Sequence, residues 1–171
     1  MAKKSFVAIL LCMALAFVLF ACASTGEPVE GPVTYNEVVD VADFSTADLF
    51  TKVNMWFVDA FKNADSVIQF SDKESGTIKG KYVSDIALSS YQQYQVTTII
   101  TVEIKDSKYR ISFTDPTYRE YQVNGYGVRM GGFSGVDKHV AYQAMADKLN
   151  EEWTVLAKSL KDSVQSSSGN W

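Results

Sequence analysis

The sequence predicts an α+β fold in which an antiparallel sheet of at least four strands is covered by helices on one face only. Two observations lead to this prediction. Alternating apolar and polar residues fill the middle of the chain, as is typical of strands with one buried face. Apolar residues at helical spacing occur before these strands and again toward the C-terminus, so a helix in the N-terminal half and a long C-terminal helix are expected to cover the sheet.

The first expected elements are a strand over Val33–Val41 and an amphipathic helix of about four turns. Ser45 is the expected N-cap of this helix, and Asp48 follows it by three residues as in a short-armed capping box. The apolar residues then recur at the spacing of one helical face: Leu49, Val53, Trp56, Phe57, Ala60 and Phe61. We therefore expect this face to press Trp56 into the core.

The middle of the chain predicts antiparallel hairpins. Two short runs, Ser66–Phe70 and Thr77–Val83, are joined by a polar turn that ends in Gly76. A long alternating strand over Tyr94–Lys105 then turns at Asp106 and Ser107 into a further strand. The uncovered sheet face is expected to be polar and to carry Gln93, Gln95, Thr97, Thr101, Glu103, Arg110, Ser112 and Thr114.

The last third of the chain predicts a loop and a long helix. Residues 114–135 are rich in tyrosine and glycine and show no clear period, so an irregular segment is expected there. The closing helix is expected from about Asp137 to Val164, with Met145, Leu149, Trp153, Leu156 and Leu160 on its apolar face. A frayed tail over 166–171 should follow.

The N-terminus has the pattern of an export signal. Lys3 and Lys4 precede an apolar run over Phe6–Ala21. A helix of this run would span roughly 24 Å, short of the ~30 Å hydrocarbon core of a bilayer. No basic cluster follows it, so a cleaved signal is favoured over a retained transmembrane helix.

Leu19-Phe20-Ala21-Cys22 resembles the lipobox of bacterial lipoproteins, although Phe20 stands where a small residue is usual. The resemblance implies lipidation of Cys22, a signal peptide over 1–21, a flexible tether over 22–32 and one domain over 33–165. The alternative is ordinary cleavage after Ala23, at an A-x-A match that would discard the cysteine. Ala23 and Ser24 follow the cysteine, and neither is the aspartate that is linked to inner-membrane retention in some bacteria. This favours the outer membrane.

Cysteine content and charge exclude several classes of function. Cys12 and Cys22 are the two cysteines, and both lie in or beside the signal, so the mature domain is expected to have no disulfide, thiol chemistry or cysteine-bound metal. Without Lys3 and Lys4 the chain keeps 14 basic and 20 acidic residues. An acidic exported domain is a poor candidate for binding nucleic acid.

The strands and the helix before them resemble the bacterial DUF4468 family of unknown function, which has a TBP-like fold. The family pattern is an aromatic helix followed by two hairpins, and the likeness covers roughly residues 33–120. The residues that match are Trp56, Ile68, Gln69, Asp72, Lys73, Glu74, Gly76, Ile78, Gly80, Tyr109, Arg110, Phe113 and Asp115. This resemblance implies a curved antiparallel sheet flanked by helices, and it implies no activity, since "TBP-like" describes shape rather than DNA binding.

Few residues suggest chemistry. His139 is the single histidine, which leaves no histidine pair or triad to assemble, and it is expected at the surface of a helix start. The glycines between Gly125 and Gly132 miss the dinucleotide-binding spacing. The acidic run from Asp72 is expected to be a solvated turn, and Arg110 is expected to pair with Asp115. We therefore predict no catalytic residue, no cofactor and no metal.

The aromatic residues that a core explains least are Tyr118, Tyr121 and Tyr126, which cluster among glycines. Together with Arg110 they form the predicted recognition surface. The favoured function is a lipid-anchored, non-catalytic envelope protein that binds a protein partner or an envelope component through its polar sheet face or the Tyr/Gly-rich loop. The alternative is an exported hydrolase with an acid pair that the sequence does not reveal.

Overall fold

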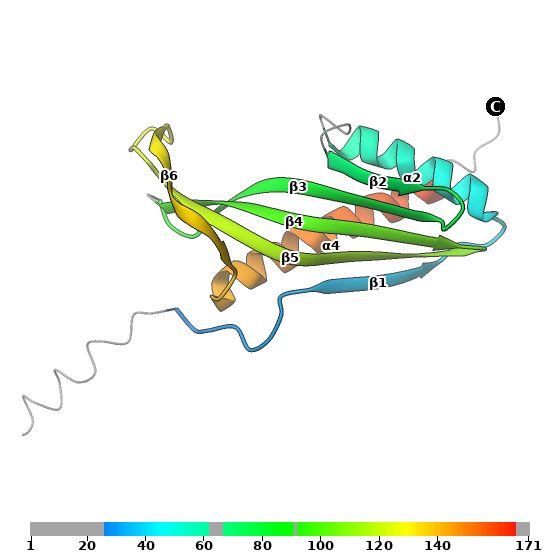
Figure 1. Cartoon of the computed structure of the whole chain (residues 1–171), viewed down its shortest axis with the longest axis horizontal. Helices are drawn as coiled ribbons and strands as arrows, with labels where there is room; N and C mark the ends of the chain where they lie inside the picture. Colours follow the sequence, from blue (N-terminus) through cyan, green and yellow to red (C-terminus); the bar gives the residue numbers. More distant parts are fainter. Residues whose placement is uncertain (1–25, 62–66, 91, 167–171) are drawn as a thin grey trace, which may run out of the picture.

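The computed structural model describes residues 26–61, 67–90 and 92–166 of the 171-residue chain, so Cys22 and the signal lie outside the described residues. One antiparallel sheet contains six strands and is flanked by two helices (Figure 1). In chain order the elements are β1 (Tyr35–Asp40), α2 (Thr46–Ala60), β2 (Ile68–Asp72), β3 (Thr77–Ala87), β4 (Gln92–Lys105), β5 (Lys108–Val123), β6 (Arg129–His139) and α4 (Gln143–Ser166).

The strand order is β1-β5-β4-β3-β2, with β6 as a second partner of β5. β4 pairs along the whole of β5, so the other edge of β5 is shared by two strands. β1 occupies residues 108–113 of that edge, and β6 occupies residues 117–123. The long hairpin of β4 and β5 is therefore the centre of the sheet, and β6 extends one end of it (Figure 1).

Both helices cover the same face of the sheet. α2 contacts α4 and β4, while α4 also contacts β1. Trp153 of α4 stacks on Phe113 of β5 with ring centroids 5.5 Å apart and planes 6° from parallel. The indole Nε1 of Trp56 donates a hydrogen bond to Ser159 Oγ at 3.1 Å, which joins the two helices. The predicted class, a curved antiparallel sheet with two helices on one face, is confirmed.

Local sequence fixes where α2 begins and how closely it approaches the sheet. Ser45 is the N-cap and its Oγ accepts a hydrogen bond from the Asp48 N–H at 3.2 Å, as predicted. Gly80 lies under this helix. A Cβ at Gly80 would be 3.2 Å from side-chain atoms of Phe57, Ile100 and Val67, so glycine allows α2 to pack against β3.

The segment expected to be irregular is largely strand. β5 continues to Val123 and β6 begins at Arg129, while α4 begins at Gln143 rather than near Asp137. The register shifts between Thr97 and Ile99, where β5 has one extra residue and Asp115 has a φ of 49°. Before this bulge odd-numbered residues of β5 face the helices, and directly after it even-numbered residues do. The regular alternation that predicts a strand is therefore interrupted.

No helix in the described ranges is long and apolar enough to cross a bilayer. Part of the expected tether contacts the domain. The Gln143 N–H donates to the Glu27 carbonyl at 2.8 Å, and the Val29 N–H donates to the Ala141 carbonyl at 3.0 Å. Pro28 and Tyr142 form the antiparallel bridge between these two bonds, so residues 27–29 lie along the segment that links β6 to α4.

Candidate binding surface on the open face of the sheet

The face of the sheet opposite the helices, called the open face here, is lined by polar side chains from three adjacent strands. On the helix side of β4 lie the buried side chains Val96, Thr98, Ile100, Val102 and Ile104. Residues between them alternate to the open face, and the β4–β5 register places Thr101 beside Ser112 and Glu103 beside Arg110. The polar positions that the sequence assigns to one sheet face therefore do lie together.

Charge is distributed unevenly over the molecule. The chain as a whole has a formal net charge of −4. The open face nevertheless carries more basic than acidic side chains, by strand position and pairing. The basic ones are Lys79, Lys81, Lys105, Lys108, Arg110, Arg119 and Arg129, and the acidic ones are Asp40, Asp72, Asp85, Glu103 and Asp137. An acidic partner would meet a locally favourable surface here.

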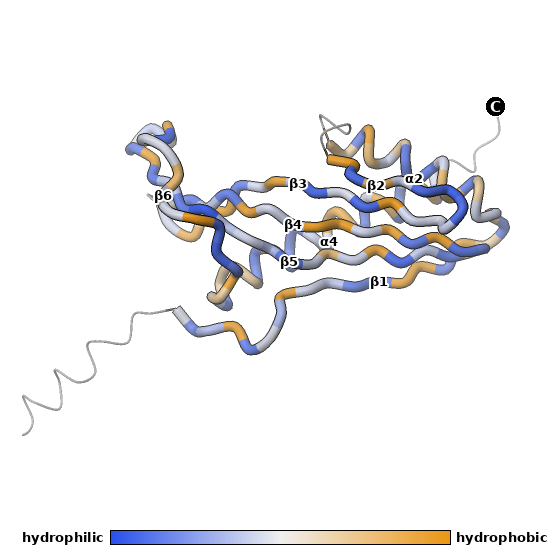
Figure 2. The backbone as a smooth tube through the Cα atoms, in the orientation of Figure 1, coloured by the Kyte–Doolittle hydropathy of each residue, from blue (hydrophilic) through white to orange (hydrophobic). Residues whose placement is uncertain are grey.

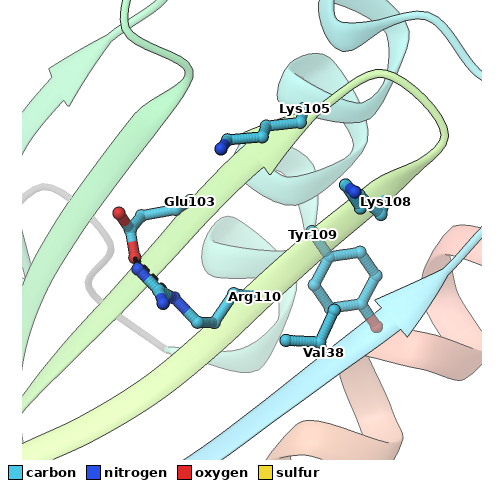
Figure 3. Close-up of a pocket in the computed structure, with 6 residues that line it drawn as sticks. All are labelled: Val38, Glu103, Lys105, Lys108, Tyr109 and Arg110. Carbon is cyan, nitrogen blue, oxygen red and sulfur yellow. Dashed lines mark hydrogen bonds and ion pairs between the residues drawn. The ribbon is translucent and has the colours of Figure 1, made fainter.

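A shallow hollow of about 240 Å³ lies where β1, β4 and β5 run side by side. It is lined by Val38, Glu103, Lys105, Lys108, Tyr109 and Arg110. Figure 3 shows the Arg110 side chain turned toward Glu103, and Arg110 Nε donates to Glu103 Oε2 at 2.8 Å. Lys105 and Lys108 face each other across the β4–β5 pair. Within the described residues neither ammonium group has an ion-pair partner, so both can bind an anionic group of a ligand.

At its other end the open face is covered by β6. The guanidinium of Arg129 lies 4.1 Å from the ring centroid of Tyr121 and 4.5 Å from that of Phe133. The Tyr121 hydroxyl lies 2.9 Å from both Asp85 Oδ1 and Gln93 Oε1. Burial, followed by the hydrogen bond to Asp85, raises the pKa of Tyr121 above its usual value. These contacts form a second small core on the open side of the sheet.

An ion pair between Arg119 of β5 and Asp137 of β6 holds the two strands together. The Arg119 guanidinium makes two hydrogen bonds to the carboxylate. Nε donates to Oδ1 of Asp137, and Nη2 donates to Oδ2 at 3.1 Å. The hydrogen bond from Arg119, together with the charges of Arg119 and Lys81, lowers the pKa of Asp137. The pair is half-exposed, so it orients β6 more than it stabilises the fold.

The four residues of the predicted recognition surface lie in different places. Tyr118 is buried on the helix side, where its ring makes an edge contact with Tyr94 at 5.4 Å. Tyr121 is buried under Arg129 on the open side. Tyr126 is 93% exposed near the β5–β6 turn, and Arg110 lines the hollow. The expectation that the three tyrosines cluster in a loop is wrong, because Tyr118 and Tyr121 belong to opposite faces of β5.

Other sequence expectations have mixed outcomes. Arg110 pairs with Glu103 across the β4–β5 pair, and not with Asp115, because Asp115 lies in the bulge. His139 is exposed at the end of β6 rather than at a helix start. The turn at Asp72 is confirmed, since its carboxylate accepts the backbone N–H groups of Glu74 and Ser75.

One half-buried carboxyl group, on α4, is absent from the sequence predictions. Glu152 follows Leu149 by three residues, on the side of the helix that faces the sheet. Burial raises the pKa of Glu152, and the Ser84 hydroxyl offsets part of the shift. Close by in the core lie the buried polar atoms Tyr82 Oη, Thr98 Oγ1 and Trp153 Nε1. The sequence signal that could have identified Glu152 is its position on the inward face of the predicted helix.

These residues do not form an acid pair or a metal centre in the described part of the chain. Two further hollows are lined by Glu120, Tyr121, Gln122, Met130 and Gly132, and by residues 31–34 with Asp115, Pro116, His139 and Val140. Each of the three hollows therefore has one carboxylate in its lining. No cluster of three or more histidine, cysteine, aspartate or glutamate side chains occurs there either.

Comparison with known proteins relates the chain to a family and a fold. Residues 35–119 match the model of the domain of unknown function DUF4468 with TBP-like fold. A TBP-like protein from Parabacteroides distasonis ATCC 8503 superposes with a TM-score of 0.61 at 14% identity, over 82% of this chain and 97% of that one. A DUF4468 family protein from Bacteroides ovatus ATCC 8483 gives 0.49 at 20% identity, over 81% and 91%.

Among curated protein sequences, none is significantly similar to this chain. The family match extends over β1 to β5 with α2 between them, which is the part of the chain where the sequence pattern of the family was seen. The structural likeness extends further, since it covers 82% of this chain. This chain therefore belongs, through residues 35–119, to the DUF4468 family of domains with a TBP-like fold.

Proposed function

We propose that this protein is an exported, lipid-anchored cell-envelope protein that acts without catalysis, as a binding module. The observation that carries the proposal is the open face itself. Six strands bury one side under two helices, while the other side presents polar and charged groups from β3, β4 and β5. A sheet needs only one covered face for its stability, so the second face is available for a partner.

The shape of the surface favours a macromolecular partner over a small ligand. The hollow beside Arg110 has about 240 Å³, below the range of roughly 300–1,000 Å³ usual for small-molecule pockets. Its lining is charged, and within the described part of the chain no ion pair involves Lys105 or Lys108, which lie beside the exposed Val38. A protein or an envelope component with acidic groups fits this surface, and nucleic acid is disfavoured by the acidic chain as a whole.

The proposed anchor rests on the N-terminal sequence. Lys3 and Lys4, the apolar run after them and Leu19-Phe20-Ala21-Cys22 together favour export and lipidation at Cys22. Two or more acyl chains would then hold the protein stably on a membrane. The residues after Cys22 favour the outer membrane over the inner one.

Photo-crosslinking in intact cells tests the binding surface. A photoreactive amino acid at Thr101, on the open face, is compared with the same group at Thr154, on the exposed side of α4. We expect a discrete crosslinked product from position 101 and none from position 154. Products from position 154 alone, or equal yields from both positions, would contradict the proposal.

Fatty-acid labelling tests the anchor separately. Cells are grown with a labelled fatty acid, and the wild-type chain is compared with Cys22→Ser. The wild-type chain should carry the label and sediment with membranes, and the variant should lose both properties. A label that persists in Cys22→Ser, or is absent from the wild-type chain, would rule out lipidation at this residue.

A further inference from the structure

The stretch from the β5–β6 turn to the start of α4 exposes more large apolar side chains than any other stretch of similar length among the described residues. Of the eleven large hydrophobic side chains that are exposed, five lie within residues 126–142. They are Tyr126, Val128, Met130, Val136 and Tyr142, and we call them the apolar end. In Figure 2 hydrophobic positions are seen at the β5–β6 turn and along β6. Exposed apolar residues in such a group usually mark a site of interaction.

Several glycines at this end have open space around them. A Cβ placed on Gly125, Gly127, Gly131, Gly132 or Gly135 would meet no atom within 4 Å. The turn is held instead by the Asn124 carboxamide, whose Oδ1 accepts the backbone N–H groups of Tyr126 and Val128 at 3.0 Å. Tyr126 and Val128, which are 93% and 59% exposed, therefore project from a defined turn.

The start of the described chain is fastened to the same end. Residues 27–29 are hydrogen-bonded to residues 141–143, immediately after β6. Figure 1 shows β6 and the first turns of α4 at one end of the molecule, away from the β2–β3 and β4–β5 turns. The polypeptide thus enters the domain beside Tyr142, which follows β6, whereas Tyr126 and Val128 precede that strand.

The length of chain before this point is short. Cys22 precedes Gly26 by four residues, so their Cα atoms are at most about 14 Å apart even when the chain is fully extended. A lipid on Cys22 would therefore keep Tyr142 and the end of β6 beside it close to the membrane.

β6 itself carries more basic than acidic side chains, while Glu27 and Glu120 lie at the same end of the molecule. Asp137 is already neutralised by Arg119, which leaves Arg129 and Lys138 as the positive groups of β6. Basic side chains beside exposed aromatic and aliphatic ones are the combination that binds the interface of membranes with anionic lipids. Tyr126 and Tyr142 have the apolar ring and polar hydroxyl that suit the headgroup level.

We propose that the apolar end rests in the lipid headgroup region and sets the orientation of the anchored domain, so that the open face points along or away from the membrane. This inference rests on the proposed lipid anchor at Cys22. A second copy of the chain or a protein partner could also cover the apolar end, and the test below distinguishes them from lipid.

Nitroxide labelling measures the depth of the apolar end. Because the mature chain has no cysteine besides Cys22, which the lipid would occupy, an added cysteine is a unique labelling site. The acylated protein carrying Tyr126→Cys is reconstituted into vesicles of phosphatidylethanolamine and phosphatidylglycerol. Phe70→Cys on β2, also an exposed aromatic position, is the matched control.

We expect the label at position 126 to collide several-fold more with oxygen than with a water-soluble nickel chelate, relative to the label at position 70. Adding Val128→Ser and Met130→Ser should reduce that ratio. Equal ratios at the two positions would overturn the proposal, and so would a label at 126 that is shielded from both reagents, as protein contact would produce. The mass of the lipid on Cys22, measured on the same sample, shows independently whether the anchor is present.

Discussion

The two faces of the sheet consist of the same strands but depend on different interactions. On the helix side, Trp56, Trp153 and Phe113 are almost fully buried, so this side supplies the core. On the open side, the contacts are cross-strand pairs of polar groups, such as Arg110 with Glu103, at side chains that are about half exposed. Residues of the first kind should control stability, and residues of the second kind should be replaceable without unfolding the domain.

The largest effect is expected for Trp153→Ala. The indole is fully buried and stacks on Phe113, so its removal leaves a cavity between α4 and the sheet. We expect a loss of about 3–5 kcal/mol in the free energy of unfolding, measured by urea denaturation. Val155→Ala on the same helix is the control, because Val155 is 67% exposed and should change stability by less than about 0.5 kcal/mol. Similar losses in the two variants would mean that α4 packs through another face.

Gly80→Val tests how closely α2 approaches the sheet. A Cβ at this position lies 3.2 Å from three side chains, and the branched side chain would add atoms beyond it. Overpacking should destabilise the fold by about 1–3 kcal/mol. Thermal denaturation of Gly132→Ala provides the comparison, since a Cβ there meets nothing within 4 Å and its stability should stay near that of the parent. An unchanged melting temperature for Gly80→Val would argue against the close helix–sheet contact.

Glu152→Gln should change how stability depends on pH. Burial raises the pKa of Glu152 in the folded state, so the folded protein binds this proton more tightly than the unfolded chain does. The parent's free energy of unfolding should therefore fall as the pH rises from about 4, the ordinary value for glutamate, through the raised folded-state pKa. The variant should lack this component and be more stable than the parent at neutral pH. If the free energy of unfolding depended on pH in the same way for the two proteins, the Glu152 carboxyl group would have to be solvated in the folded state.

The smallest effect on stability is expected for Arg110→Ala on the open face. Its ion pair with Glu103 is about half exposed, so we expect a loss of at most about 1 kcal/mol, reduced further by salt. The same change should lower the crosslinking yield from position 101 if an acidic partner binds there. A loss of stability as large as that of Trp153→Ala would mean that the open face also holds the fold together.

The sequence predicts the covered face well because the buried residues there recur at the regular spacings of a strand and of a helix. Alternation gave the inward positions of β4, and the Ser45 cap and apolar spacing gave α2, as the structure confirms. The far half of β5 was not predictable in this way. One extra residue at Asp115 reverses which side chains of β5 face the helices beyond it, so Tyr118 lies on the helix side and Tyr121, three residues later, on the open side.

The candidate site was predictable only as a polar face. Its outward positions follow from strand alternation, but the hollow depends on how β1 lies against β5, 70 residues or so along the chain. The cover over Tyr121 likewise depends on β6, whose glycine-rich sequence has little strand character. Long-range pairing of this kind leaves no local signal in the sequence.

The most direct test of the central claim compares the reactivity of one cysteine on each side of the molecule. Lys79→Cys lies on the open face and Lys161→Cys on the exposed side of α4, so the two variants lose the same charge. A membrane-permeant maleimide is applied to the purified protein and to intact cells. We predict that in cells the reaction slows at position 79 and not at position 161, relative to the purified protein. Equal slowing at both positions, or slowing at position 161 alone, would contradict the account that the open face is the surface that a partner covers.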